Sequence, residues 1–298
     1  MCDVDGMTSA SILTNYLFML NSHWTQSNVT HIMHEGKQHG LSDVMNMILS
    51  DTSLVVCPDS ASNDRKQHKI LVEKGIKVLC LDHHECDCDS ENALIINPQI
   101  NSYPNKAITG AGVTWQFCKA LDRLCEVEPY ADNLLDLCAI GMIGDMSNYR
   151  EVETRAIVSL GLKNLKNPFL VGLANAHAYV IEKRNGLNYL SMAFGVCPWI
   201  NATCRTGEMK EKQLVFSAML EQNKNSIVPS SKRGHKGEPV SLVEEAILVA
   251  ERIKRRQTDA QNEAMAYIEH QIDDNNLLDN AMLFLIDEEG KIDSGVRG

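Results

Sequence analysis

The sequence lacks any run of about 18 consecutive apolar residues, the usual minimum for a transmembrane helix, although 44% of its 298 residues are hydrophobic. Its opening segment, MCDVDGMTSA, has no basic stretch ahead of an apolar one and so does not have the pattern of a secretory signal peptide. We therefore expect a cytoplasmic protein with a sizeable buried core, arranged as one large domain or two smaller ones.

Paired cysteines at zinc-finger spacing are also missing, because the 10 cysteines include no CxxC pair. They are scattered through apolar segments, which is typical of reduced, buried thiols in a cytoplasmic protein. Cys86 and Cys88 form a CxC beside His83 and His84. This group is an alternative zinc site, which the absence of the usual ligand spacing makes the less favoured interpretation.

Basic charge and aromatic residues are scarce as well: the formal net charge is -11 and aromatic residues make up 5% of the chain. This balance argues against a protein that coats duplex DNA by charge alone. It leaves other nucleic-acid binding open, because carboxylates that hold metal ions add negative charge that the bound cations offset.

The apolar pattern of residues 1–150 alternates between strands and helices. Strands are expected at 29–33, 54–57 and 77–81, and helices at 8–20, 41–49, 66–74, 112–124 and 134–143. This βαβ rhythm predicts an α/β fold with a parallel sheet covered by helices on both faces. In such sheets ligands bind beyond the carboxyl ends of the strands, so the residues after each strand are the first place to look for chemistry.

The rest of the chain divides into four parts. Residues 151–225 have a more helical pattern, 226–240 form a basic linker rich in helix breakers, 241–273 form a long charged helix, and 281–286 form a strand. We expect residues 1–225 to make one domain with its α/β core over 1–150. The long helix would connect it to a second α/β domain that begins at 274–298.

Four acidic clusters stand at or near predicted strand ends of the α/β part. They are Asp3 with Asp5, Asp59, Asp82-His83-His84, and Asp145. A single Asp in such a place is usually a solvated turn residue. Together, carboxylates and imidazoles suit Mn²⁺ or Mg²⁺, and two such ions could activate a water and stabilise both oxygens of an in-line displacement at phosphorus.

In this order, DxDG at 3–6, PD at 58–59, DHH at 82–84 and GxxxD at 141–145 resemble the motifs of the DHH phosphoesterase superfamily. Further segments are similar to its RecJ branch, including bacteriophage members: PDSASND (58–64), TGAGV (109–113), ETR with GL (153–155 and 161–162), PWINATCRTG (198–207) and SGVRG (294–298). The resemblance implies a metal-dependent exonuclease on single-stranded DNA in repair, recombination or replication, with 5′ to 3′ polarity. It also implies that residues 274–298 open a DHHA1 domain.

The resemblance assigns roles residue by residue. The implied metal ligands, for Mn²⁺ or Mg²⁺ and for two ions, are Asp3, Asp5, Asp59, Asp82, His83 and Asp145. The catalytic set would be Asp82, His83, His84 and Asp145, with His84 beside the ligands or on the phosphate. Asn201 and Arg205 would contact the DNA strand or the scissile phosphate, a task that suits the planar guanidinium. A surface ion pair is the alternative for Arg205.

Two further groups could contact nucleic acid. Lys232 and Arg233 in the basic linker would line a path for the strand, or they belong to a solvated linker. Trp199, Tyr189 and Phe194 stand near the Asn201 segment and could stack bases, although such aromatics are more often part of a core.

Both ends depart from the RecJ pattern. The first acid of its DxDxDG motif falls on Met1, and the sequence stops where a DHHA1 domain would continue. We therefore expect an internal piece of a longer protein, or a wrongly assigned start.

Three functions stay open: the single-strand exonuclease, a phosphodiesterase for oligoribonucleotides or cyclic dinucleotides, and a non-catalytic DHH scaffold that binds a strand or a partner. Competition by long against very short DNA separates the first two. The retained acids and histidine at 59, 82, 83 and 145 argue against the scaffold, because buried acids are costly to keep without a use.

Overall fold

The computed structural model describes residues 3–21, 23–24, 28–35, 39–100, 102–274 and 282. Their α-helices are α1 (Val4–Leu20), α2 (Arg65–Glu73), α3 (Gly110–Leu124), α4 (Leu135–Gly144), α5 (Val152–Lys163), α6 (Pro168–Ala176), α7 (Ala178–Lys183), α8 (Tyr189–Gly195), α9 (Cys197–Thr206), α10 (Met209–Ala218) and α11 (Leu242–Asp274). The strands are β1 (Leu54–Pro58), β2 (Lys77–Leu81), β3 (Leu94–Ile96), β4 (Ile227–Pro229) and β5 (Pro239–Ser241). Short 3₁₀ turns occur at Met45–Met47, Tyr130–Leu134 and Glu221–Asn223.

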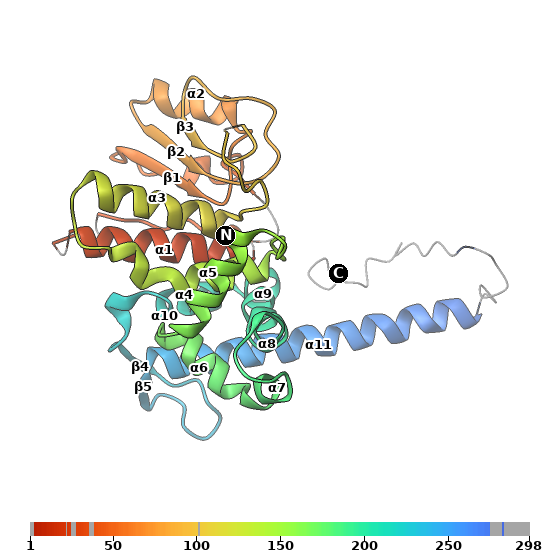
Figure 1. Ribbon diagram of the computed structural model, residues 1–298. Coiled ribbons are helices and arrows are strands. Elements are labelled where there is room, and N and C mark those ends of the chain that lie inside the picture. The colour runs from red at the N-terminus through yellow and green to blue at the C-terminus, as the bar shows by residue number, and fades with distance from the viewer. Residues whose placement is uncertain are drawn as a thin grey trace.

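Strands β1, β2 and β3 form a parallel sheet in that order. Alternate residues of a strand face opposite sides, so β2 buries Val78 and Cys80 in a cluster with Leu71 of α2, while Leu81 joins the main core. Helix α2 covers one face of the sheet, and α1 and α3 lie on the other (Figure 1). This arrangement confirms the predicted α/β class with a parallel sheet between helices.

Helix α4 forms the centre of the main core. Its sequence, LDLCAIGMIG, is apolar on every side except for Asp136, and Leu137, Ala139 and Met142 are all buried. A helix that is apolar all round needs neighbours on every side. Helices α1, α3 and α5 supply most of them. The helices that border the sheet therefore share one core with the helices that follow α4, which we call the helical half (α5 to α11).

Helix α11 confirms the predicted long helix. Its first half packs on α6, α9 and α10 and buries residues up to Gln257. Its 33 residues correspond to about 50 Å, and its second half extends away from the body (Figure 1). Across the described ranges, no helix combines the length and the apolar character needed to cross a membrane.

Several predicted elements differ from the structure. Residues 29–33 form no strand, and 41–49 contain only a 3₁₀ turn instead of a helix. The ends of the predicted linker at 226–240 pair as the antiparallel hairpin β4–β5. Strand β3 was not predicted. The expected strand at 281–286 and the segment 294–298 lie outside the described residues, apart from position 282.

Candidate metal centre

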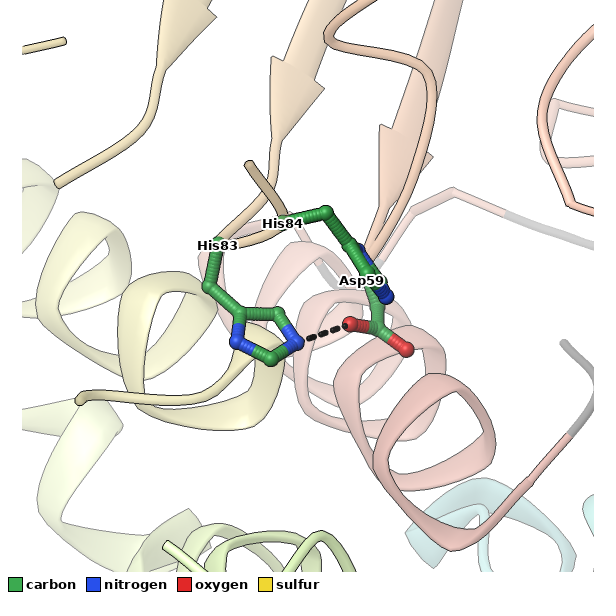
Figure 2. Close-up of side chains that lie close together, drawn as sticks. All are labelled: Asp59, His83 and His84. Atoms are coloured by element: carbon green, nitrogen blue, oxygen red, sulfur yellow. Dashed lines mark ion pairs between the residues drawn. The ribbon is translucent and has the colours of Figure 1, made fainter. Parts of the chain in front are cut away.

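Four side chains from four elements meet around one imidazole nitrogen. Nε2 of His83 lies 3.2 Å from Oδ1 of Asp59, 3.6 Å from Oδ2 of Asp5 and 3.9 Å from Oδ2 of Asp145. Asp59 and His83 follow β1 and β2, as predicted, and Figure 2 shows the His83 ring directed at the Asp59 carboxylate. Asp5 instead lies in the first turn of α1, and Asp145 follows the last turn of α4.

The first turn of α3 fixes the Asp5 carboxylate. Oδ1 accepts hydrogen bonds from the Thr109 hydroxyl and the Ala111 N–H, both at 2.9 Å, and Oδ2 accepts one from the Gly110 N–H at 2.7 Å. Free N–H groups at a helix start favour negative charge. A Cβ at Gly110 would lie 2.4 Å from Oδ1 of Asp59, so only glycine allows this close approach.

Helix α4 reaches Asp5 because two glycines let it pack closely on α1. A Cβ at Gly141 would lie 2.3 Å from the Thr8 hydroxyl, and one at Gly144 would lie 2.5 Å from Cβ of Val4. Any larger residue would push the two helices apart. The small residues of the GxxxD motif thus bring Asp145 to the other carboxylates.

Asp59 is the most constrained member of the group. It is 3% exposed, and its φ of 60° lies in the left-handed region, which Asp tolerates better than most residues. Its Oδ1 is buried, and within the described residues it accepts no hydrogen bond. Burial, and then the neighbouring charge of Asp5, hold its pKa well above the ordinary value. A buried carboxylate oxygen with this surplus of negative charge calls for a cation.

The pKa values of Asp5 and Asp145 are raised in the same way. Burial raises the pKa of Asp5, although His83 opposes the shift. Burial, followed by the charge of Asp5, raises the pKa of Asp145 to about 6. Possible ligand atoms fall into two groups, Asp59 with His83 and His84, and Asp5 with His83 and Asp145, each with its atoms within 4.8 Å of one another. Oxygen and imidazole donors so close together fit a divalent cation such as Mn²⁺ or Mg²⁺.

Asp82 points its carboxylate at N–H groups. Oδ1 accepts from the His83 and His84 N–H groups and from Nδ1 of His84 at 2.8 Å, and Oδ2 accepts from the Ser62 N–H. Burial alone would raise the pKa of Asp82, but the bonds from His84 and Ser62 outweigh it and hold the pKa below the ordinary value. Asp82 thus organises the loop and orients His84, and it belongs to neither ligand group. Its predicted role as a direct ligand stays a prediction.

Asp3 has a local structural role. Its side chain accepts from the Gly6 N–H at 3.0 Å and so caps α1. Its charge also contributes to raising the pKa of Asp5, Asp59 and Asp145, so it lies close to the centre without belonging to either ligand group.

Helix α9 holds the start of α1 and brings Asn201 and Arg205 to this side of the molecule. Oδ1 of Asn201 accepts from the Val4 N–H at 3.2 Å, and Sγ of Cys204 donates to the Asp3 carbonyl at 3.3 Å. Arg205 follows one turn after Asn201 and is exposed. The surface ion pair considered for Arg205 does not form among the described residues.

Two arginines of α11 are used inside the structure. Arg252 and Arg256 both pair with Glu211, at 3.6 and 2.7 Å. Lys232 and Arg233 are exposed on the β4–β5 hairpin, which Figure 1 shows at the far end of the helical half from the start of α1. The geometry of the centre therefore gives these two residues no role, and their contact with nucleic acid stays a prediction.

Sequence reasoning missed two parts of the site. The backbone donors of Gly110 and Ala111 carry no side-chain signal, and only the resemblance of the TGAGV segment pointed to them. His39 lies next to His84, with ring centroids 5.2 Å apart, and burial lowers its pKa. Nothing in the sequence around His39 marks this position. Cys86 and Cys88 belong to no candidate metal group in the described part of the chain, and the nine cysteines described there are free thiols.

Comparison with known proteins shows which family the first part of the chain matches. Residues 1–142 match the model of the DHH family, N-terminal domain. Over 298 aligned residues, 99% of the chain, it is 33% identical to the "Putative SPbeta prophage-derived single-strand DNA-specific exonuclease YorK" of Bacillus subtilis, and it covers 50% of that protein. It is 27% identical to the single-stranded-DNA-specific exonuclease RecJ of the same organism over 206 residues, 68% of this chain and 25% of RecJ.

Solved structures show the same fold. A crystal structure of exonuclease RecJ bound to manganese superposes with a TM-score of 0.72 at 22% identity, over 90% of this chain and 63% of that one. RecJ from Thermus thermophilus in complex with Mn²⁺ gives a TM-score of 0.66 at 23% identity, over 88% of this chain and 35% of that one. The chain thus spans about half the length of the YorK relative and a smaller share of RecJ.

Proposed function

Because this chain belongs to the DHH family, we propose that it is a metal-dependent phosphodiesterase that hydrolyses single-stranded DNA from an end. The observation that carries the proposal is the gathering of three carboxylates around Nε2 of His83. Its relatives are named as single-strand-specific exonucleases, which supports the choice of substrate. A 5′ to 3′ direction and a role in repair, recombination or replication are part of the proposal.

We assign the metal ligands to Asp5, Asp59, His83 and Asp145, with His84 beside them. Two Mn²⁺ or Mg²⁺ ions are part of the proposal, and Nε2 of His83, which belongs to both candidate groups, would bind one of them because it carries a single lone pair. A divalent ion supplies an activated water and stabilises charge on phosphate oxygens.

The protein's own residues fix the positions of these ligands. Because a carboxylate only accepts, the hydrogen bond to Asp82 places the proton of His84 on Nδ1 and leaves Nε2 as the ring atom free to coordinate or accept. Asp5 is held by three donors before any ion binds. A centre so preorganised loses little free energy to rearrangement when a cation enters.

Arg205 is the proposed contact to the strand, because it is an exposed guanidinium one turn from the residue that holds the start of α1. We retain the proposed division into a catalytic domain (1–225), a linker (226–240) and a connecting helix (241–273), with 274–298 opening a DHHA1 domain. The cytoplasmic location also stays a prediction.

The proposal is tested by incubating the full chain with 5′- or 3′-labelled DNA, single-stranded or duplex, with Mn²⁺ and with EDTA. Asp59→Asn keeps the shape of the side chain and removes its charge. Asp132→Asn is the matched control, because its carboxylate is 58% exposed and pairs with Lys119 at 3.8 Å. We expect Mn²⁺-dependent release of nucleotides from the single strand that Asp59→Asn abolishes and Asp132→Asn preserves.

Hydrolysis that persists in EDTA, or that Asp59→Asn leaves unchanged, contradicts the proposal. Hydrolysis of cyclic dinucleotides or short oligoribonucleotides in preference to long DNA would instead identify the chain as the small-substrate phosphodiesterase. Binding of the strand without hydrolysis by any metal-loaded form would identify it as a scaffold.

A further inference from the structure

Two tyrosine rings lie beside the metal centre. Tyr149, between α4 and α5, and Tyr189, the first residue of α8, pack with ring centroids 4.9 Å apart. Helix α8 packs against α4, whose C-cap is Asp145, and Tyr149 follows Asp145 by four residues, so the pair lies near this end of the centre. Tyr149 is still 37% exposed, which leaves part of the pair open to solvent.

Helix α8 carries a further exposed aromatic ring after Tyr189. A capping box between Asn188 and Ser191 starts the helix, which buries its Ser191, Met192 and Gly195 side. Its exposed surface carries Leu190 and Phe194, which are 54% and 53% exposed, and the guanidinium of Arg184 lies 4.4 Å from the Phe194 ring centroid. The seven residues of α8 correspond to about 10 Å along the helix axis. A single strand of a few nucleotides could therefore extend from the tyrosine pair to Phe194.

Large exposed side chains are normally scattered over a protein surface, whereas Tyr149, Leu190 and Phe194 gather on one short helix and the loop beside it. Tyr189 is partly buried against the main core. Trp199 is not part of the group, because it packs against His177 with centroids 3.7 Å apart. We call Tyr149, Tyr189, Phe194 and Arg184 the aromatic row.

Positive charge accompanies the aromatic row in a chain whose net charge is -11. Arg184 covers the Phe194 ring, and the guanidinium of Arg155 donates to the carbonyls of Tyr149 and Arg150, which fixes the loop that carries Tyr149. Open aromatic faces next to guanidinium groups are the chemistry that binds unpaired bases and their phosphates.

We propose that the aromatic row binds, by stacking, the bases of the single strand whose end enters the metal centre. This inference rests on the proposed function and adds a source of strand selectivity. The bases of a duplex are stacked on one another and paired, so their faces cannot reach the rings. An unpaired strand gains this contact and a duplex does not.

The test measures the affinity of the full chain for a 3′-labelled oligothymidylate by fluorescence anisotropy, in EDTA so that the probe is not consumed. A second probe of the same length has abasic residues near its 5′ end. Phe194→Ala removes the stacking face and Phe194→Trp restores one. Trp24→Ala is the matched control, because Trp24 is also exposed, at 39%, but follows the far end of α1.

We expect Phe194→Ala to bind oligothymidylate about 10-fold more weakly, the change that losing roughly one stacked base produces. The variant should bind the abasic probe as the wild type does, and Phe194→Trp and Trp24→Ala should bind both probes normally. Circular dichroism melting confirms that each variant is folded.

Equal affinity of Phe194→Ala and the wild type for oligothymidylate, with Mn²⁺-dependent hydrolysis intact, would overturn the inference and leave the proposed function standing. The expected loss of affinity without any hydrolysis by the wild type would overturn the proposed function and support base stacking. An equal loss on both probes would also overturn the inference, because the ring would then act without reading bases.

Discussion

Asp145→Asn should stabilise the metal-free protein and remove most of the stabilisation that Mn²⁺ provides. The pKa of Asp145 rises from 3.8 to about 6 on folding, and each pKa unit corresponds to about 1.4 kcal/mol. The full charge would therefore cost about 3 kcal/mol above pH 6. Because the side chain is 39% exposed, solvent screening reduces this cost to about 1–1.5 kcal/mol. The Asn side chain avoids it, which should raise Tm by roughly 2–5 °C.

The sign of the pH dependence follows from the same shift. The folded protein holds this proton more tightly than the unfolded chain does, so the charge costs stability as pH rises from about 4 to 6 and the full cost is present above that window. The advantage of Asp145→Asn should therefore be complete at pH 8 and vanish near pH 4.

Differential scanning fluorimetry with EDTA and with Mn²⁺ measures both effects. At about 100 times its Kd, Mn²⁺ should stabilise the wild type by about 2.7 kcal/mol at pH 8, and the variant much less. Asp132→Asn, at an exposed carboxylate, should change neither value. A lower Tm of Asp145→Asn in EDTA, together with an unchanged Mn²⁺ increment, would refute the reasoning that the carboxylates repel one another around a cation site.

Three further substitutions test the packing and the charges around the site. Gly110→Ala should weaken Mn²⁺ binding, measured by calorimetry, by at least about 10-fold, because its Cβ would lie 2.4 Å from Asp59; normal binding would show that α3 can shift. Asp82→Asn should lower Tm in EDTA by several degrees, because it leaves N–H groups of the loop without a charged acceptor; an unchanged Tm would contradict the structural role given to it. Glu211→Gln should cost about 1 kcal/mol of unfolding free energy in urea at pH 7 and little at pH 3. The hydrogen bond from Arg256 outweighs burial and lowers the pKa of Glu211, so the stabilisation is present above the ordinary pKa and is lost as pH falls. A loss of stability that does not depend on pH would argue against the ion pair.

The parts of the fold that the sequence predicted well are those with strong local signals. The LVVC and KVLCL segments are short apolar runs with turn residues after them, and both are strands with Asp59 and Asp82 directly beyond. Strand β3 escaped prediction because it has only three residues and pairs on one side with β2. The 29–33 segment has strand-like residues, but Met33 packs into the core without a neighbouring strand to complete a ladder.

The composition of the site could be predicted, and its geometry could not. Motif order named Asp5, Asp59, His83 and Asp145, which the structure brings together. The distinction between a ligand and an organising carboxylate depends on which N–H groups lie nearby. Asp82 accepts from its own loop and from Ser62, whereas Asp5 accepts from a helix start more than 100 residues away in sequence, and only the folded chain shows this difference.

The contact between α9 and the start of α1 joins two segments that leave the ribosome far apart in time. A growing chain that has reached residue 142, the end of the matched DHH segment, carries Asp5, Asp59 and His83 but neither Asp145 nor Asn201. The Val4 N–H, one residue before Asp5, can donate to Oδ1 of Asn201 only after 197 further residues have followed Val4. Domains generally fold as units, the N-terminal part first, while translation proceeds. The hydrogen bond that holds the start of α1 can therefore form only after α9 has been synthesised, whereas the four proposed ligands are all present once residue 145 has been added.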